Sequence, residues 1–132
     1  MSEPIRVLLV DDEELFVKSL CHVLARRGMQ VRSACDGLAA LLLLSEDKSA
    51  YDVIVLDLRM PGINGLDTLK RIRESDPGLP VILLTGNADV KLVSEALKEG
   101  INEVLLKPCP IDALVCAIEN VHEWKTMTKQ VP

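Results

Sequence analysis

Charged and hydroxyl side chains follow four short apolar runs of the sequence. Asp11 and Asp12 come directly after one run, Asp57 follows a second, and Thr85 and Lys107 follow two further runs. If the runs are parallel strands, their carboxyl ends meet at one edge of a sheet, where ligands bind in such proteins. Three carboxylates gathered there would repel one another, and a divalent cation would relieve that repulsion. The pattern therefore predicts a metal site with a hydroxyl and an ammonium group beside it.

This donor set indicates magnesium and phosphoryl chemistry. Mg²⁺ is a hard ion that binds a few carboxylates, keeps several waters and accepts phosphoryl oxygens; Mn²⁺ is an alternative ion. Phosphoryl transfer mainly requires positioning and neutralisation of charge, which the metal, Lys107 and Thr85 could supply. Asp57 is the predicted nucleophile, because the apolar run before it would exclude bulk water and a carboxylate can form an acyl phosphate. The acidic pair Asp11 and Asp12 suits the metal better.

The elements that would position these groups alternate along the chain. Apolar runs predict buried strands at 5–10, 29–34, 53–56, 81–84 and 101–106. Helical patterns lie at 13–27, 37–45, 65–75, 90–99 and 111–125. Strands alternating with helices predict an α/β fold, a (βα)5 doubly wound five-stranded parallel sheet with helices on both faces. We expect one domain at 1–125 and a C-terminal tail or the start of a linker at 126–132.

Composition and charge exclude several other classes of protein. The 132 residues, 48% of them hydrophobic, suit one domain with one core. A net charge of −5 without a basic cluster argues against direct nucleic-acid binding. The chain starts without a signal-peptide pattern, and no apolar run approaches the ~20 residues of a membrane span. We therefore expect a cytoplasmic protein without a membrane partner. Four scattered cysteines indicate neither a zinc site nor a redox motif.

Four motifs occur in chain order at the predicted strand ends. They are Asp11-Asp12-Glu13, Asp57-Leu58-Arg59-Met60-Pro61-Gly62 with Gly65, Thr85-Gly86, and Gly100 leading to Lys107-Pro108. Each is weak evidence alone, but together they span nearly the whole chain, which resembles the receiver domains of two-component response regulators, the CheY-like superfamily. The resemblance implies the flavodoxin-like strand order 2-1-3-4-5. It also implies magnesium-dependent transfer of a phosphoryl group from a histidine kinase to an aspartate.

The resemblance implies a role for each residue around the acceptor. Asp57 would accept the phosphoryl group from the phosphohistidine of a sensor histidine kinase or a phosphotransfer protein, or from a small phosphodonor. Asp12 would bind Mg²⁺ directly and Asp11 mainly through water. Asp57 itself and the backbone carbonyl of Arg59 would complete the protein ligands.

Further roles are implied around the phosphoryl group. Lys107 would bind it, Thr85 would move to hydrogen-bond it, and Pro108 resembles the family's cis proline, which would orient Lys107. Arg59 and Asn87 lie two residues beyond Asp57 and Thr85, at positions that tune the lifetime of the acyl phosphate in the family.

The chain departs from the family where the signal would be transmitted. Val104 stands where many receivers carry an aromatic residue, and its branched side chain has no ring to swing inward. Cys109 follows Lys107-Pro108 where phenylalanine is frequent. We expect these switch residues to transmit phosphorylation by backbone and helix movement.

The sequence is compatible with more than one output and partner. The chain could be a stand-alone receiver or carry a covalent output domain, and it could form a homodimer. In the run Leu41-Leu42-Leu43-Leu44, we expect Leu42 and Leu43 to face outward, because four consecutive helical residues cannot all face the core.

Each site residue also has an ordinary structural interpretation. Asp12 could cap a helix and complement its dipole, Thr85 could cap a loop, and Lys107 could be a solvated charge. Two further function classes stay open. One is a receiver-shaped scaffold that binds partners without phosphorylation. The other is an aspartate-nucleophile phosphatase, which normally has a second Asp where this chain has Arg59.

Overall fold

The computed structural model describes residues 3–47, 49–60, 64–86 and 90–130. Five strands form one parallel sheet in the order β2-β1-β3-β4-β5. The predicted fold class and strand order are therefore confirmed. The strands are β1 (Arg6–Val10), β2 (Gln30–Ala34), β3 (Val53–Leu56), β4 (Val81–Thr85) and β5 (Glu103–Leu106).

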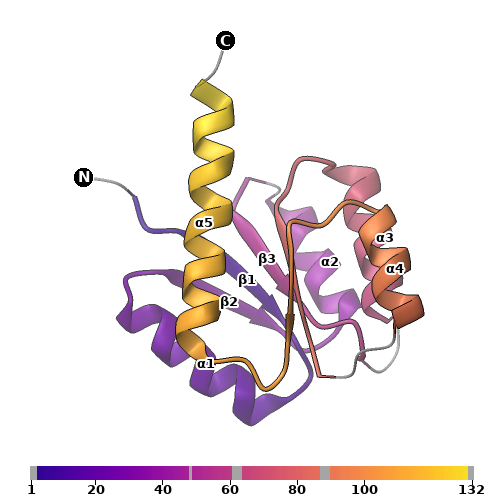
Figure 1. Ribbon diagram of the computed structural model, residues 1–132, viewed down its shortest axis with the longest axis horizontal. Coiled ribbons are helices and arrows are strands. Elements are labelled where there is room, and N and C mark those ends of the chain that lie inside the picture. The colour runs from indigo at the N-terminus through magenta and orange to yellow at the C-terminus, as the bar shows by residue number, and fades with distance from the viewer. Residues whose placement is uncertain (1–2, 48, 61–63, 87–89, 131–132) are drawn as a thin grey trace.

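Helices cover both faces of this sheet. Figure 1 shows α1 and α5 on one face and α2, α3 and α4 on the other, the arrangement that right-handed crossovers produce. The chain order of the strands reverses between β1 and β3, and a crevice forms at the carboxyl ends of strands at such a point. The helices are α1 (Glu14–Arg26), α2 (Gly37–Glu46), α3 (Gly65–Ser75), α4 (Val90–Lys98) and α5 (Ile111–Gln130).

The core lies in two layers, one on each side of the sheet. In β1, Val7 and Leu9 pack towards α1 and α5, whereas Leu8 and Val10 pack towards α2, α3 and α4. All four side chains are at most 1% exposed. A fully buried aliphatic side chain contributes roughly 1.5–3 kcal/mol relative to an exposed one. The central strands are thus held on both faces, which makes the strand ends rigid supports for the polar residues that follow them.

The last helix is longer than the sequence pattern predicts. Helix α5 continues to Gln130, beyond the expected end at Lys125, and its C-terminal part projects past the sheet in Figure 1. The apolar face that packs on the sheet ends at Val121, but no glycine or proline stops the helix before Pro132. Among the described residues no helix, α5 included, combines the length and apolar character that a bilayer span requires.

The leucines of α2 differ in part from the prediction. Leu42 is 58% exposed as expected, but Leu43 is partly buried against the core, so its predicted outward direction is wrong. The buried stripe is centred on Ala40 and Leu44, and because each residue turns the helix by about 100°, Leu43 lies on the flank of that stripe. The outward apolar pair is Leu38 and Leu42, one helical turn apart.

Candidate functional site

Three aspartates meet at the carboxyl ends of two neighbouring strands. Asp11 and Asp12 follow β1, and Asp57 follows β3, which pairs with β1 in the sheet. One carboxylate oxygen from each of the three lies within 4.8 Å of the others. Asp11 and Asp57 are 2% and 5% exposed, whereas Asp12 is open to solvent. The structure therefore brings together the acidic pair and Asp57, as the sequence pattern predicts.

The chemistry of this donor set fits a small divalent cation. Carboxylate oxygens are preferred ligands of Mg²⁺, and an exposed carboxylate such as Asp12 leaves room for the waters that this ion retains. The backbone of Arg59 lies beside the cluster, since its N–H donates a hydrogen bond to Asp57 Oδ1 at 3.0 Å. Asp12 also lines hollows of about 480 and 410 Å³ on either side of the cluster, so the site is accessible from solvent.

Lys107, which follows β5, brings a positive charge to the carboxylates. Its Nζ lies 2.6 Å from Asp11 Oδ2, 3.0 Å from Glu13 Oε1 and 3.4 Å from Asp57 Oδ2. It also lies over the ring of Phe16, 4.6 Å from the centroid. Burial lowers the pKa of Lys107, but its hydrogen bonds to Asp11 and Glu13 and the nearby negative charges raise it more, so the pKa is above its ordinary value. The side chain is an ammonium ion at any physiological pH.

The environment of Asp57 disfavours its charge. Burial raises the pKa of Asp57 above the ordinary value, and the negative charge of Asp11 acts in the same direction. The N–H of Arg59 and the charge of Lys107 lower it, but they do not cancel the effect of burial. A cation bound beside Asp57 would favour the ionised carboxylate, which is the nucleophilic form.

Thr85 presents a buried hydroxyl at the end of β4. The residue is fully buried, and its Oγ1 has no hydrogen-bond partner among the described residues. Leaving a buried polar group unpaired carries a free-energy penalty of roughly 1–3 kcal/mol. The backbone carbonyl of Thr85 accepts a hydrogen bond from Lys107 N–H at 2.9 Å, which ties β4 to the segment carrying Lys107.

The structure describes three of the four remaining residues that the sequence analysis named. The peptide bond between Lys107 and Pro108 is cis, as predicted. Val104 packs partly buried against the layer of α2, α3 and α4, and Cys109 packs against the layer of α1 and α5. Asn87 lies outside the described residues.

The helix-capping interpretation of Asp12 is wrong. The N-cap residue of α1 is Glu13, and Asp11 Oδ1 accepts the backbone N–H of Glu13 at 2.9 Å. Sequence reasoning missed the contacts that Glu13 and Phe16 make with Lys107. The only feature of the sequence that could have indicated these two residues is their position just after the acidic pair.

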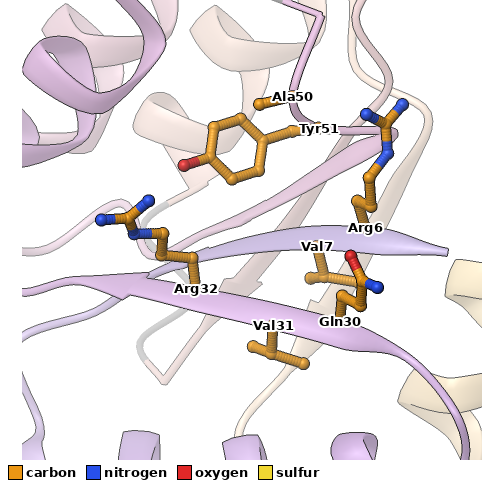
Figure 2. Close-up of a pocket in the computed structure, with 7 residues that line it drawn as sticks. All are labelled: Arg6, Val7, Gln30, Val31, Arg32, Ala50 and Tyr51. Carbon is orange, nitrogen blue, oxygen red and sulfur yellow. The ribbon is translucent and has the colours of Figure 1, made fainter. Parts of the chain in front are cut away.

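A separate hollow of about 280 Å³ lies towards the amino ends of β1 and β2. Figure 2 shows Tyr51 facing these strands between Arg6 and Arg32. Arg6 is already paired, because its Nε and Nη2 each lie 3.2 Å from a carboxylate oxygen of Asp52. Among the described residues, no aspartate lines this hollow, so we do not assign phosphoryl chemistry to it.

Comparison with known proteins identifies the family. The family model described as response regulator receiver domain matches residues 7–119. The C4-dicarboxylate transport transcriptional regulatory protein DctD of Pseudomonas aeruginosa is 38% identical over 122 residues, which are 92% of this chain and 26% of that protein. A crystal structure of a response regulator receiver domain protein from Clostridium thermocellum is 31% identical with a TM-score of 0.88, covering 94% of this chain and 98% of that chain. The CheX–CheY–BeF3–Mg²⁺ complex from Borrelia burgdorferi is 28% identical with a TM-score of 0.83, covering 89% of each chain.

The chain belongs to the receiver domains of two-component response regulators. The general function of this family is to be phosphorylated on an aspartate, so this chain is a signalling domain. Family membership decides against the aspartate-nucleophile phosphatase. The chain spans only 26–28% of the length of the first curated relatives, DctD of two organisms and AtoC of Escherichia coli.

Proposed function

We propose that Asp57 is the aspartate that this receiver domain phosphorylates. The observation that carries the proposal is the position of its buried carboxylate, within 4.8 Å of oxygens of Asp11 and Asp12 and 3.4 Å from the Lys107 ammonium. Asp11 is bound to that ammonium at 2.6 Å, and Asp12 is exposed and lines the hollows beside the cluster, so Asp57 is the buried carboxylate left for the phosphoryl group. We assign Asp11 and Asp12 to the cation rather than to the phosphoryl group.

In the proposed reaction an oxygen of Asp57 attacks the phosphorus of the donor. A new Oδ–P bond forms, while the P–N bond of a phosphohistidine or the P–O bond of a small acyl phosphate breaks and the leaving group takes the electron pair. The donor is a sensor histidine kinase, a phosphotransfer protein or a small phosphodonor. The domain thereby catalyses its own phosphorylation, and water later hydrolyses the acyl phosphate.

Asp11, Asp12, Asp57 and the carbonyl of Arg59 would hold Mg²⁺, with Mn²⁺ as the alternative. When bound, the ion neutralises charge on the transferring oxygens and on Asp57. Lys107 neutralises a further phosphoryl oxygen. Thr85 then gains the hydrogen-bond partner that its buried hydroxyl lacks among the described residues, and this gain favours movement of β4 after phosphorylation.

Two pairs of residues shape what happens after acceptance. Arg59 and Asn87 tune the lifetime of the acyl phosphate rather than acceptance. Val104 and Cys109 transmit the change through packing, because neither carries an aromatic ring that could swing. The longer relatives support a covalently attached output domain, and the acidic chain is not itself the nucleic-acid-binding part.

Intact-mass analysis after incubation with acetyl phosphate and Mg²⁺ tests the acceptor. We expect one labile phosphoryl adduct on the wild type and on the control Asp67→Asn, whose carboxylate is exposed on α3. Asp57→Asn should carry none. An adduct on Asp57→Asn, or none on the wild type, would refute the assignment and favour the phosphorylation-independent scaffold.

A further inference from the structure

Two residues at the start of α1 surround the Lys107 ammonium. Glu13 is the N-cap residue and Phe16 lies in the first turn. Glu13 Oε1 lies 3.0 Å from Lys107 Nζ, and the Phe16 ring centroid lies 4.6 Å from it. A cation over an aromatic face is attracted by the ring quadrupole. Both contacts join residues about ninety positions apart, so they depend on the fold and not on local sequence.

The distances indicate where the ammonium rests. Of its three carboxylate neighbours, Asp57 is the most distant, at 3.4 Å against 2.6 Å for Asp11 and 3.0 Å for Glu13. An ammonium has three N–H donors, and three carboxylate oxygens already surround this one. Phosphorylation removes the charge of the Asp57 carboxylate, and an ammonium that shifts towards the new phosphoryl oxygen must lengthen its contact with Asp11 or Glu13.

Solvent exposure decides which neighbour yields. The Asp11 side chain is 1% exposed, so water cannot replace the ammonium there, and only the proposed cation would remain to balance its buried charge. The Glu13 side chain is 61% exposed, so water can replace the ammonium at little cost. Glu13 is thus the exchangeable neighbour.

We propose that Glu13 and Phe16, the Lys107 clamp, hold the ammonium in a resting position from which it must shift to contact a phosphoryl group on Asp57. They are positioning residues that act through Lys107, and the proposal rests on the function proposed for Asp57. The clamp stabilises the unphosphorylated state more than the transition state. It therefore slows phosphoryl acceptance.

Kinetics with acetyl phosphate and Mg²⁺ test the clamp. Glu13→Gln should raise the maximal rate of adduct formation roughly two- to five-fold, the change that an exposed charged contact produces. Phe16→Leu keeps apolar bulk and should raise it by a similar factor. Glu13→Asp keeps the charge but shortens the side chain, so it should behave like Glu13→Gln.

Glu14→Gln is the matched control. Glu14 lies in the same turn and carries the same charge, but it is not among the carboxylates that pair with Lys107. Removing the charge of Glu14 should leave the maximal rate of adduct formation unchanged and alter only the half-saturating concentration of the anionic donor. A Glu13→Asp rate equal to the wild type, or equal effects of Glu13→Gln and Glu14→Gln, would show a general charge effect and overturn the clamp.

A measurement without phosphorylation separates this proposal from the function of Asp57. In metal-free buffer, the ¹⁵N NMR signal of the Lys107 ammonium should shift in Glu13→Gln and stay in place in Glu14→Gln. An unshifted signal in Glu13→Gln overturns the clamp even if Asp57 is phosphorylated. Failure of the wild type to form an adduct refutes the acceptor assignment, whatever the NMR result.

Discussion

Replacing Gly65 by alanine tests how closely α3 must approach the acceptor loop. Gly65 begins α3, is buried, and donates its N–H to Leu58 O at 3.0 Å. A Cβ added there would lie 2.3 Å from Asp57 O and 2.5 Å from Leu58 Cα. Both are backbone atoms, so no side chain can rotate away. The methyl group must push either α3 or the backbone of the proposed acceptor.

The size of that push follows from ordinary contact distances. Non-bonded heavy atoms sit at roughly 3.5 Å or more, so about 1 Å of movement is needed. Overpacking of this kind destabilises by about 1–3 kcal/mol. Alanine gains at most about 1 kcal/mol from helix propensity and the restricted unfolded chain. The steric effect wins, and we expect Gly65→Ala to lower the free energy of unfolding by about 1–2 kcal/mol.

The effect on phosphorylation should be larger than the effect on stability. A misplacement of about 1 Å in a reacting group can reduce a rate by roughly 10²-fold. Urea denaturation should show that the Gly65→Ala protein is folded. Its rate of adduct formation with acetyl phosphate should be reduced by about one to two orders of magnitude. Gly78→Ala is the control, because its added Cβ would be 3.8 Å from the nearest atom, Asp76 Oδ1. Stability and rate like the wild type in Gly65→Ala would refute the reasoning.

Three further substitutions test charges and hydrogen bonds, and urea denaturation measures their effect on stability. Asp57→Asn should be more stable than the wild type near neutral pH without metal, because burial raises the pKa of Asp57. A carboxyl group with a raised pKa stabilises the folded protein below its unfolded pKa of about 3.9, and this stabilisation is lost as the pH rises through the folded pKa. The stability advantage of Asp57→Asn should therefore vanish in acid, where Asp57 is protonated. For Asp52, burial raises the pKa but the hydrogen bonds from Arg6 lower it more. Asp52→Asn should therefore cost about 1 kcal/mol near neutral pH and nothing in acid, and a loss independent of pH would contradict this. Arg73 donates from Nε and Nη2 to Gly100 O at 2.9 and 2.7 Å, a fork that lysine cannot reproduce. Arg73→Lys should cost about 1–2 kcal/mol, and an unchanged urea midpoint would show that this contact is dispensable.

The sequence alone determined the order of the elements and the edge that carries the chemistry. Buried parallel strands need nearly continuous apolar runs, and such runs in the sequence predict β1 and β3. The polar residue after each run must lie at the same edge, because parallel strands run in one direction. The meeting of Asp11, Asp12 and Asp57 could therefore be predicted without knowing any side-chain direction.

Local sequence patterns predict less well the features that side-chain packing decides, such as where a helix ends and which residues face the core. Among the described residues, the buried face of α5 that packs on the sheet ends at Val121, but the helix runs to Gln130 because backbone hydrogen bonding can continue beyond the packed face until a stop signal. The sequence predicts that Leu43 faces outward, because four consecutive helical residues cannot all face the core. In the structure Ala40 and Leu44 are buried, and the leucines on both flanks, Leu41 and Leu43, also pack partly buried against the core.

Only the tertiary structure decided the contacts of Lys107. Its pairing with Glu13 and its position over Phe16 join the residue after β5 to the start of α1. The motifs place Glu13 and Lys107 at one edge of the sheet, but they do not say that these residues touch. The order of distances from its ammonium to Asp11, Glu13 and Asp57 depends on how α1 packs beside the sheet. Sequence determines which charges reach the edge because strand direction is a backbone property. Which charges touch is decided by side-chain packing, to which every neighbouring element contributes.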